Sequence, residues 1–197
     1  LCDWSSDVCS SDLSTYYLPF EMSIRDGGAK GIMCSYNRIN GVPSCANEGL
    51  LQTIVRDQWK FDGYVTSDSG AIDDIYLHHN YTSDWNETVQ VALDAGCDIE
   101  SATWGKNGAW RTGGHYIDVI PTAVRAGILD EELHVNRAVR NALRIRFQLG
   151  LFDYDPPNEQ NTASFWNISP NVIQSAAHVT FAKEATAQGL DRKSTRL

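Results

Sequence analysis

Polar side chains whose types could do chemistry follow three short apolar runs of the sequence. Asp68 is the clearest case, because it follows the β-branched run of residues 64–67 and precedes Ser69 and Gly70. In parallel α/β folds functional groups gather at the carboxyl ends of strands, where a carboxylate can act as nucleophile, acid or base. An aspartate that opens a helix is also a common N-cap, so Asp68 alone leaves both interpretations open. The other polar groups are Ser35-Tyr36-Asn37, and Asp98 with Glu100.

The runs that must position these groups alternate with helical patterns. Short buried strands are predicted over residues 31–36, 64–67 and 97–100. Apolar spacing, capping residues and charge placement predict helices over residues 48–59, 84–95, 115–126, 130–149 and 171–187. This alternation is typical of an α/β fold with a parallel sheet. About three strands are too few to close a barrel, so we expect the C-terminal portion of one.

The amino-acid composition limits the classes of partner that the chain is expected to bind. The chain has 197 residues, a net charge of −9 and a pI of about 4.9. This acidic balance argues against nucleic acid, whose binding depends on clustered Lys and Arg, and fits poorly with an anionic polymer. No apolar run approaches the roughly 20 residues of a membrane helix, so no membrane partner is expected. Six Trp and eight Tyr suit sugar binding, although most of them are expected in the core.

Neither a metal nor a cofactor is expected from the sequence. The five histidines are scattered, and the adjacent His78 and His79 would point to different sides of any regular element. No cysteine pair has the spacing of a zinc site. Five cysteines leave at least one unpaired within the chain. Cys34 and Cys45 flank a short, turn-rich loop, and we predict a disulfide between them.

Three N-glycosylation sequons begin at Asn80, Asn86 and Asn167, and they favour a secreted protein. The first residues lack the charged and apolar regions of a signal peptide. Residues 1–13 contain a near-repeat without periodicity and residues 191–197 turn abruptly basic, so we expect both ends to be foreign to the natural protein. The proline-containing polar stretch 153–170 is expected to be a linker between residues 14–152 and residues 171–190.

Several motifs, in order, resemble glycoside hydrolase family 3. They are LPF at 18–20, MCSYNRINGVPSCAN at 33–47, LLQTIVRDQWKFDGYVTSDSGAI at 50–72 and AGCDIE at 95–100. The helix over 130–150 with the following LFD, and KEATAQGL at 183–190, also resemble the family. The resemblance implies a (β/α)8-type, TIM-like barrel followed by an α/β sandwich. Residues 14–152 would be the C-terminal part of the barrel, and residues 171–190 the start of the sandwich.

The resemblance also implies site residues. The family's nucleophile is the Asp of a Gly-x-Val-x-Ser-Asp motif, which here is Asp68. Its Ser-Tyr-Asn motif places Tyr36 beside that nucleophile, where a hydroxyl can keep a carboxylate ionised. Met33 would lie near the same pocket, or else fill the core. The family's Lys-His substrate-binding motif lies upstream of this chain, and its acid/base is usually a Glu of the second domain. We therefore expect a fragment that lacks the acid/base and is inactive by itself.

Two departures from the family pattern concern sulfur. Many members have Cys at the positions of Ser69 and Ser101, and both positions differ here together, as if a bridge were lost as a pair. Cys97, inside AGCDIE, is then expected to be a free thiol. Lys60 replaces a Gly that is usual in the family, which we expect to be harmless.

The resemblance leads to a retaining exo-glycosidase that hydrolyses terminal β-linked sugars through a covalent glycosyl-enzyme on Asp68. Its substrates would be oligosaccharides or aryl glycosides. The motifs look most like the β-xylosidase and α-arabinofuranosidase branch, with β-glucosidase as the alternative. Two further hypotheses are a non-catalytic sugar-binding or structural derivative of the fold, and an unrelated α/β domain with Asp68 as a helix cap. The sequence leaves the oligomeric state open.

Overall fold

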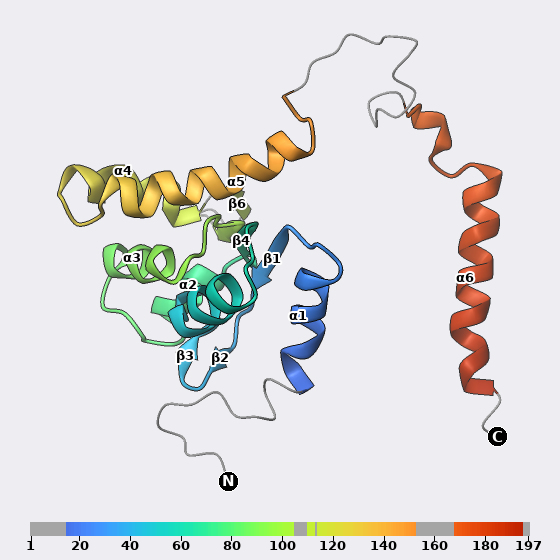
Figure 1. Ribbon diagram of the computed structural model, residues 1–197, viewed down its shortest axis with the longest axis horizontal. Coiled ribbons are helices and arrows are strands. Elements are labelled where there is room, and N and C mark those ends of the chain that lie inside the picture. Colours follow the sequence, from blue (N-terminus) through green and yellow to red (C-terminus); the bar gives the residue numbers. More distant parts are fainter. Residues whose placement is uncertain (1–14, 105–109, 113, 153–167, 195–197) are drawn as a thin grey trace. The chain divides into compact units, whose positions relative to one another are not determined.

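The computed structural model describes residues 15–104, 110–112, 114–152 and 168–194 (Figure 1). The chain divides into two compact units, Leu1–Phe152 and Asp153–Leu197. The second unit contains the 3-10 turn η6 (Pro170–Val172) and the helix α6 (Ala176–Ser194). The first unit contains the parallel strands and the predicted site residues, apart from Asn167, which lies outside the described residues.

A parallel strand pair forms the centre of the first unit. Strand β1 (Gly31–Cys34) pairs with β4 (Tyr64–Ser67), and Cys34 lies opposite Ser67 in the register. The predicted third strand is shorter than expected, because residues 97–100 contribute one parallel bridge between Ile99 and Thr66. That bridge is held by the Ser67 amide, which donates to the Ile99 carbonyl at 2.8 Å. The fold is therefore mixed α/β with parallel pairing, as predicted.

Helices connect these strands. The π-helix η3 (Gly49–Gln58) joins β1 to β4, and Asn47 caps its start by accepting from the Leu50 amide at 3.0 Å. Helix α2 (Ala71–Leu77) follows β4, and α3 (Trp85–Ala95) precedes the bridge at Ile99. The predicted boundaries of α3 are confirmed: the Asp84 carboxylate accepts from the Glu87 amide, and Gly96 ends the helix at φ 98°.

The predicted helices over 115–126 and 130–149 are also confirmed. The first is α4 (Gly114–Arg125), and the second begins as the π-helix η4 (Glu131–Asn136) and continues as α5 (Arg137–Gln148). The Asp130 carboxylate caps η4 by accepting from the Leu133 amide. The sequence did not predict the helices α1 (Leu18–Arg25) and α2, the short turn η2 (Ser44–Ala46), or the hairpins β2–β3 (Arg38–Ile39, Val42–Pro43) and β5–β6 (Ala102–Trp104, Trp110–Thr112).

The helix predicted over residues 171–187 begins later in the structure than predicted. Ile173 is extended and Gln174 has a φ of 56°, so the helix begins only at Ala176. The side chains of residues 176–189 are exposed, so the expected apolar face is not buried within this unit.

The core of the first unit lies between β4 and the helices α2 and α3. Val65, Ile72, Ile75 and Val89 are fully buried, with an exposed fraction of 0% each. Burying such a side chain contributes roughly 1.5–3 kcal/mol. All four belong to one buried cluster, and Val65 and Ile72 lie on the strand and the helix on either side of Asp68, so the core fixes the two elements that bracket the candidate site. No helix within the described ranges is long and apolar enough to cross a membrane.

Candidate active site

The residues that follow β1 and β4 lie side by side at the carboxyl edge of the sheet. Because Cys34 and Ser67 are register partners, the next residues of both strands leave the sheet together. The Asp68 amide donates to the Cys34 carbonyl at 3.0 Å, which extends the ladder by one residue. The structure therefore brings Asp68 close to the segment that carries Tyr36.

Asp68 is half-buried and is not the cap of α2. Its carboxylate accepts a hydrogen bond from the Ser69 amide at 2.7 Å. The N-cap position of α2 belongs to Gly70, at φ 86°, and no side chain caps this helix. The left-handed Gly70 turns the chain sharply, and its amide donates to the Ala102 carbonyl at 2.7 Å. The geometry thus does not support the helix-cap interpretation of Asp68.

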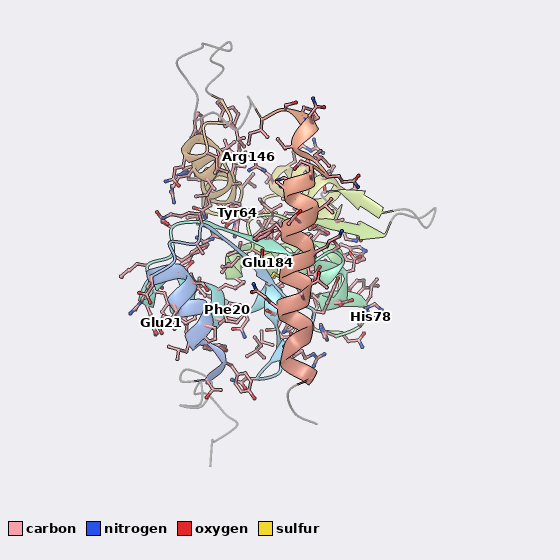
Figure 2. The ribbon with its side chains drawn as sticks, turned by 90° about the vertical axis from the view of Figure 1, so that its right-hand side faces the viewer. Phe20, Glu21, Tyr64, His78, Arg146 and Glu184 are labelled. Carbon is pink, nitrogen blue, oxygen red and sulfur yellow. A yellow bond between two sulfur atoms is a disulfide. The ribbon has the colours of Figure 1, made fainter. Side chains whose placement is uncertain are left out.

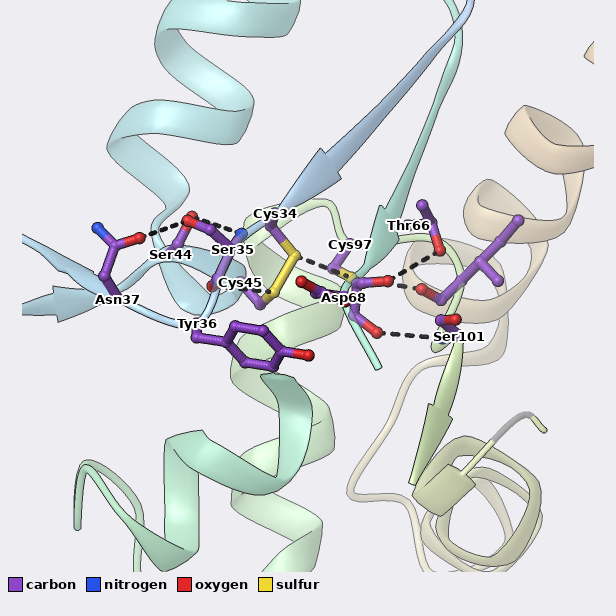
Figure 3. The surroundings of a disulfide bond; sticks show 12 residues. Cys34, Ser35, Tyr36, Asn37, Ser44, Cys45, Thr66, Asp68, Cys97 and Ser101 are labelled. Carbon is purple, nitrogen blue, oxygen red and sulfur yellow. Dashed lines mark hydrogen bonds between the residues drawn. A yellow bond between two sulfur atoms is a disulfide. The ribbon is translucent and has the colours of Figure 1, made fainter. Parts of the chain in front are cut away.

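Tyr36 reaches the Asp68 turn from β1. Its hydroxyl donates to the Ser69 carbonyl at 2.8 Å, and its ring extends toward Asp68 in Figure 3. Desolvation, followed by the neighbouring carboxylate of Asp68, raises the pKa of Tyr36. The phenol therefore stays protonated and remains a hydrogen-bond donor beside the carboxylate.

Met33 is placed elsewhere. Its side chain is 58% exposed, so it does not fill the core of the described chain. It lines an apolar hollow with α1 and η3, beside Phe20, Ile24 and Trp59 (Figure 2 labels Phe20). Neither Asp68 nor Tyr36 lines that hollow, so the structure does not bring Met33 together with the pair. Its contact with a substrate stays a prediction.

Three buried sulfur atoms lie beneath the site. Cys34 and Cys45 are joined by a disulfide, with a Cα–Cα distance of 5.1 Å, which ties the end of β1 to η2 (Figure 3). Cys97 is a free thiol whose Sγ lies 3.7 Å from that of Cys34. Burial raises the pKa of Cys97 to about 12, so it stays protonated. Two of the three sulfur atoms are therefore in the disulfide and the third is a thiol, so the trio offers no thiolate to a metal ion.

Ser69 and Ser101, the two positions at which the family resemblance leads us to expect cysteines, face each other. Their hydroxyl oxygens are 3.2 Å apart, within hydrogen-bonding distance. The Ser101 amide also donates to the Ser67 hydroxyl at 3.0 Å. The hydrogen bond therefore links the same two segments that a bridge would link.

The strand run that contains Asp98 and Glu100 does not supply groups to the site. The Asp98 carboxylate accepts from the Val65 amide at 2.8 Å, near the amino end of β4, and from Arg56 at 2.6 Å. The carboxylate of Glu100 is buried and accepts from the Tyr116 amide at 2.7 Å, at the start of α4. Burial raises the pKa of both carboxyl groups. Both carboxylates are structural acceptors, contrary to the expectation from their place in the sequence.

Two of the predicted glycosylation sites can be located. Asn80 is exposed and Asn86 is half-buried in the first turn of α3. The threonines of both sequons are buried, and their hydroxyls lie 2.6 Å apart (Thr82 and Thr88). This contact provides a structural reason for the threonines, and glycosylation itself stays a prediction.

One contact of the site was missed by sequence reasoning. The imidazole Nε2 of His79 lies 2.7 Å from the Tyr36 carbonyl oxygen. The sequence pattern of the adjacent histidines was interpreted only in terms of metal binding. Their side chains were expected to point to different sides, and His78 indeed contacts Asp74 and not Tyr36. The sequence signal that could have predicted this contact is the pair His78-His79, which follows the helix that starts beside Asp68.

Comparison with known sequences finds a family model and relatives that all belong to one family of glycosyl hydrolases. The model of the glycosyl hydrolase family 3 N-terminal domain matches residues 7–145. The probable β-D-xylosidase 6 of Arabidopsis thaliana is 39% identical over 189 residues, which cover 95% of this chain and 22% of the relative. The probable exo-1,4-β-xylosidase xlnD of Neosartorya fischeri is 36% identical over 192 residues, covering 95% and 23%. The chain thus spans less than a quarter of the length of these relatives.

Comparison with solved structures points to the same family. A family 3 exo-β-xylosidase in complex with a xylobiose aziridine activity-based probe superposes with a TM-score of 0.64 at 32% identity, covering 76% of this chain and 18% of that one. The β-glucosidase of Listeria innocua in complex with glucose gives a TM-score of 0.62 at 28% identity, covering 76% and 19%. From the matched domain, the relatives and the fold together, the chain belongs to glycoside hydrolase family 3.

Proposed function

We propose that this chain is the nucleophile-bearing part of a longer retaining exo-glycosidase. The observation that supports this most is the pairing of Asp68 with Tyr36 at the carboxyl edge of the parallel strands. The carboxylate is half-buried and held by the Ser69 amide, and a protonated phenol lies beside it. Residues 14–152 would then be the C-terminal part of the barrel, and residues 171–190 the start of the sandwich domain.

In this proposal Asp68 attacks the anomeric carbon of a terminal β-linked sugar and forms a covalent glycosyl-enzyme. An acid elsewhere in the longer protein protonates the leaving oxygen, and then activates the water that releases the sugar. Retaining enzymes hold the two carboxyl groups about 5–5.5 Å apart. Asp98 and Glu100 are engaged by buried donors, so neither supplies the second carboxyl group.

The substrate is proposed to be a β-xyloside or an α-arabinofuranoside, because the two sequence relatives described above are named β-xylosidases. A β-glucoside is the second candidate, supported by the likeness to a β-glucosidase that binds glucose. A non-catalytic sugar-binding derivative is less well supported, since such a derivative would not require an aspartate and a tyrosine in contact. The Cys34–Cys45 disulfide and the exposed Asn80 support a secreted protein.

The decisive experiment is covalent trapping in the longer protein. A 2-deoxy-2-fluoro xyloside with a good leaving group slows the release of the intermediate, and mass spectrometry of peptides should locate the sugar on Asp68. Asp68→Asn should give no adduct. The exposed Asp57, whose carboxylate accepts only from Gln52 in the same helix among the described contacts, provides the matched control Asp57→Asn. An adduct on another residue would contradict the proposal.

The isolated 197-residue chain is proposed to be inactive, because it spans less than a quarter of the relatives described above and the family's acid/base is expected in another domain. General acid catalysis is worth about 10²–10⁴-fold, and activated aryl glycosides need it least. Turnover of p-nitrophenyl xyloside or glucoside well above that of an Asp68→Asn chain would show that the fragment is self-sufficient.

A further inference from the structure

His79 holds the segment that carries Tyr36 through two directed hydrogen bonds. Its Nε2 lies 2.7 Å from the Tyr36 carbonyl oxygen, and its Nδ1 lies 3.1 Å from Nε of Arg38. Arg38 also donates to the His79 carbonyl. The carbonyl of Tyr36 can only accept and the guanidinium of Arg38 can only donate. Both bonds therefore require the neutral imidazole with its proton on Nε2.

The position of His79 connects both ends of Tyr36 to one element. The Tyr36 hydroxyl donates to the Ser69 carbonyl, just before α2, and the Tyr36 carbonyl accepts from His79, just after α2. The His79 amide donates to the Asp74 carbonyl at 2.8 Å, and Asn80 turns the chain at φ 48°. Because α2 begins at the Asp68 turn, it sets the position of the phenol relative to the carboxylate.

We infer that His79 is a positioning residue that places Tyr36 against Asp68. This inference rests on the proposed function, because it assigns His79 a role in the reaction of that site. It acts through the backbone of Tyr36 and contacts no reacting atom. The neighbouring His78, labelled in Figure 2, is exposed and pairs with Asp74.

Substitutions can separate positioning from general folding. In His79→Ala both hydrogen bonds are lost. In His79→Gln the side-chain amide can donate to the Tyr36 carbonyl and its oxygen can accept from Arg38, so the pair of bonds is retained. His78→Gln is the matched control, since it changes the adjacent histidine without touching the Tyr36 segment.

The experiment measures kcat and KM on an aryl xyloside in the longer protein. We expect His79→Ala to lower kcat about tenfold, the value of one or two hydrogen bonds, with KM changed little. His79→Gln should recover most of the loss and His78→Gln should match the wild type. In a double-mutant cycle, His79→Ala should add little to Tyr36→Phe, because both act on the same contact.

Wild-type turnover in His79→Ala, or independent losses in the cycle, would overturn the inference. Trapping keeps the two proposals apart. If the fluorosugar adduct is found on Asp68 and the losses are independent, His79 is only structural and the proposed function stands. If Asp68 is not labelled, the proposed function fails and the positioning role fails with it.

Discussion

Two aspartates contact the two ends of β4 and differ in almost every respect. Asp98, near the amino end, has a side chain that is 1% exposed and accepts from Arg56, Val65 and Asn141 at 2.6–2.9 Å. Asp68, at the carboxyl end, is half-buried and accepts from one backbone amide, with the Tyr36 phenol beside it. Three directed donors hold the buried carboxylate of Asp98 out of reach of a substrate, whereas a half-exposed carboxylate can approach one.

The comparison therefore separates a carboxylate that stabilises the fold from one that is available to react. The first is surrounded by donors from three different elements, and the second is reached from solvent. Each of the following experiments tests one side of this difference.

The largest expected effect is on turnover at the reactive end. Asp68→Asn removes the proposed nucleophile, and in the longer protein kcat on an aryl xyloside should fall about 10³-fold or more. The free energy of unfolding should change by less than about 1 kcal/mol, because one partly exposed acceptor is exchanged for another. A large loss of stability with retained turnover would reverse the roles assigned to the two aspartates.

The next effect is on stability at the buried end. Asp98→Ala leaves the Arg56 guanidinium, the Val65 amide and the Asn141 amide without their acceptor, so unfolding should become easier by about 3–5 kcal/mol. Chemical denaturation of the variant beside Asp57→Asn provides the measurement. Equal stability of the two variants would show that the buried cluster is dispensable.

The disulfide gives a smaller effect at the reactive end. Cys45→Ser opens a link across 11 residues of sequence, and the entropy model assigns about 3 kcal/mol to a loop of this length. The variant should unfold at lower denaturant and should no longer respond to a reductant. If the wild type with its disulfide reduced is as stable as the oxidised protein, the link does not stabilise this segment.

The smallest effect is a pH dependence at the buried carboxyl Glu100. Burial raises its pKa in the folded protein above the ordinary 4.5, so the folded state binds the proton more tightly than the unfolded chain. The stabilisation is fully present below the unfolded pKa and is lost as pH rises through the folded pKa. The slope is at most about 1.4 kcal/mol per pH unit. In Glu100→Gln the denaturation midpoint should fall less steeply with rising pH, measured from about pH 4.5 upward. An unchanged slope would contradict this.

Local signals in the sequence predicted much of the fold. Asp84 and Asp130 were recognisable as helix starts, because short carboxylates bond the free amides of the first turn. The two apolar runs before Tyr36 and Asp68 were recognisable as strands, and order along the chain made parallel pairing the expected arrangement. The short hairpins were missed because two- or three-residue strands leave no periodic pattern to detect. The helices α1 and α2 were missed as well, since 8 and 7 residues give only about two turns of apolar spacing.

By itself, the sequence determined the family, the parallel strands and the identity of Asp68 and Tyr36 as a candidate pair, since each depends on residue types in local order. Tertiary structure alone decided what the other carboxylates do. Asp98 and Glu100 lie in a predicted strand run, as Asp68 lies at the end of one, but their partners come from residues 16 to 43 positions away. Tertiary structure also decided that His79 contacts the Tyr36 segment, across 43 residues of sequence. The role of a polar side chain depends on the donors, charges and solvent around it, and folding brings these together from distant parts of the chain.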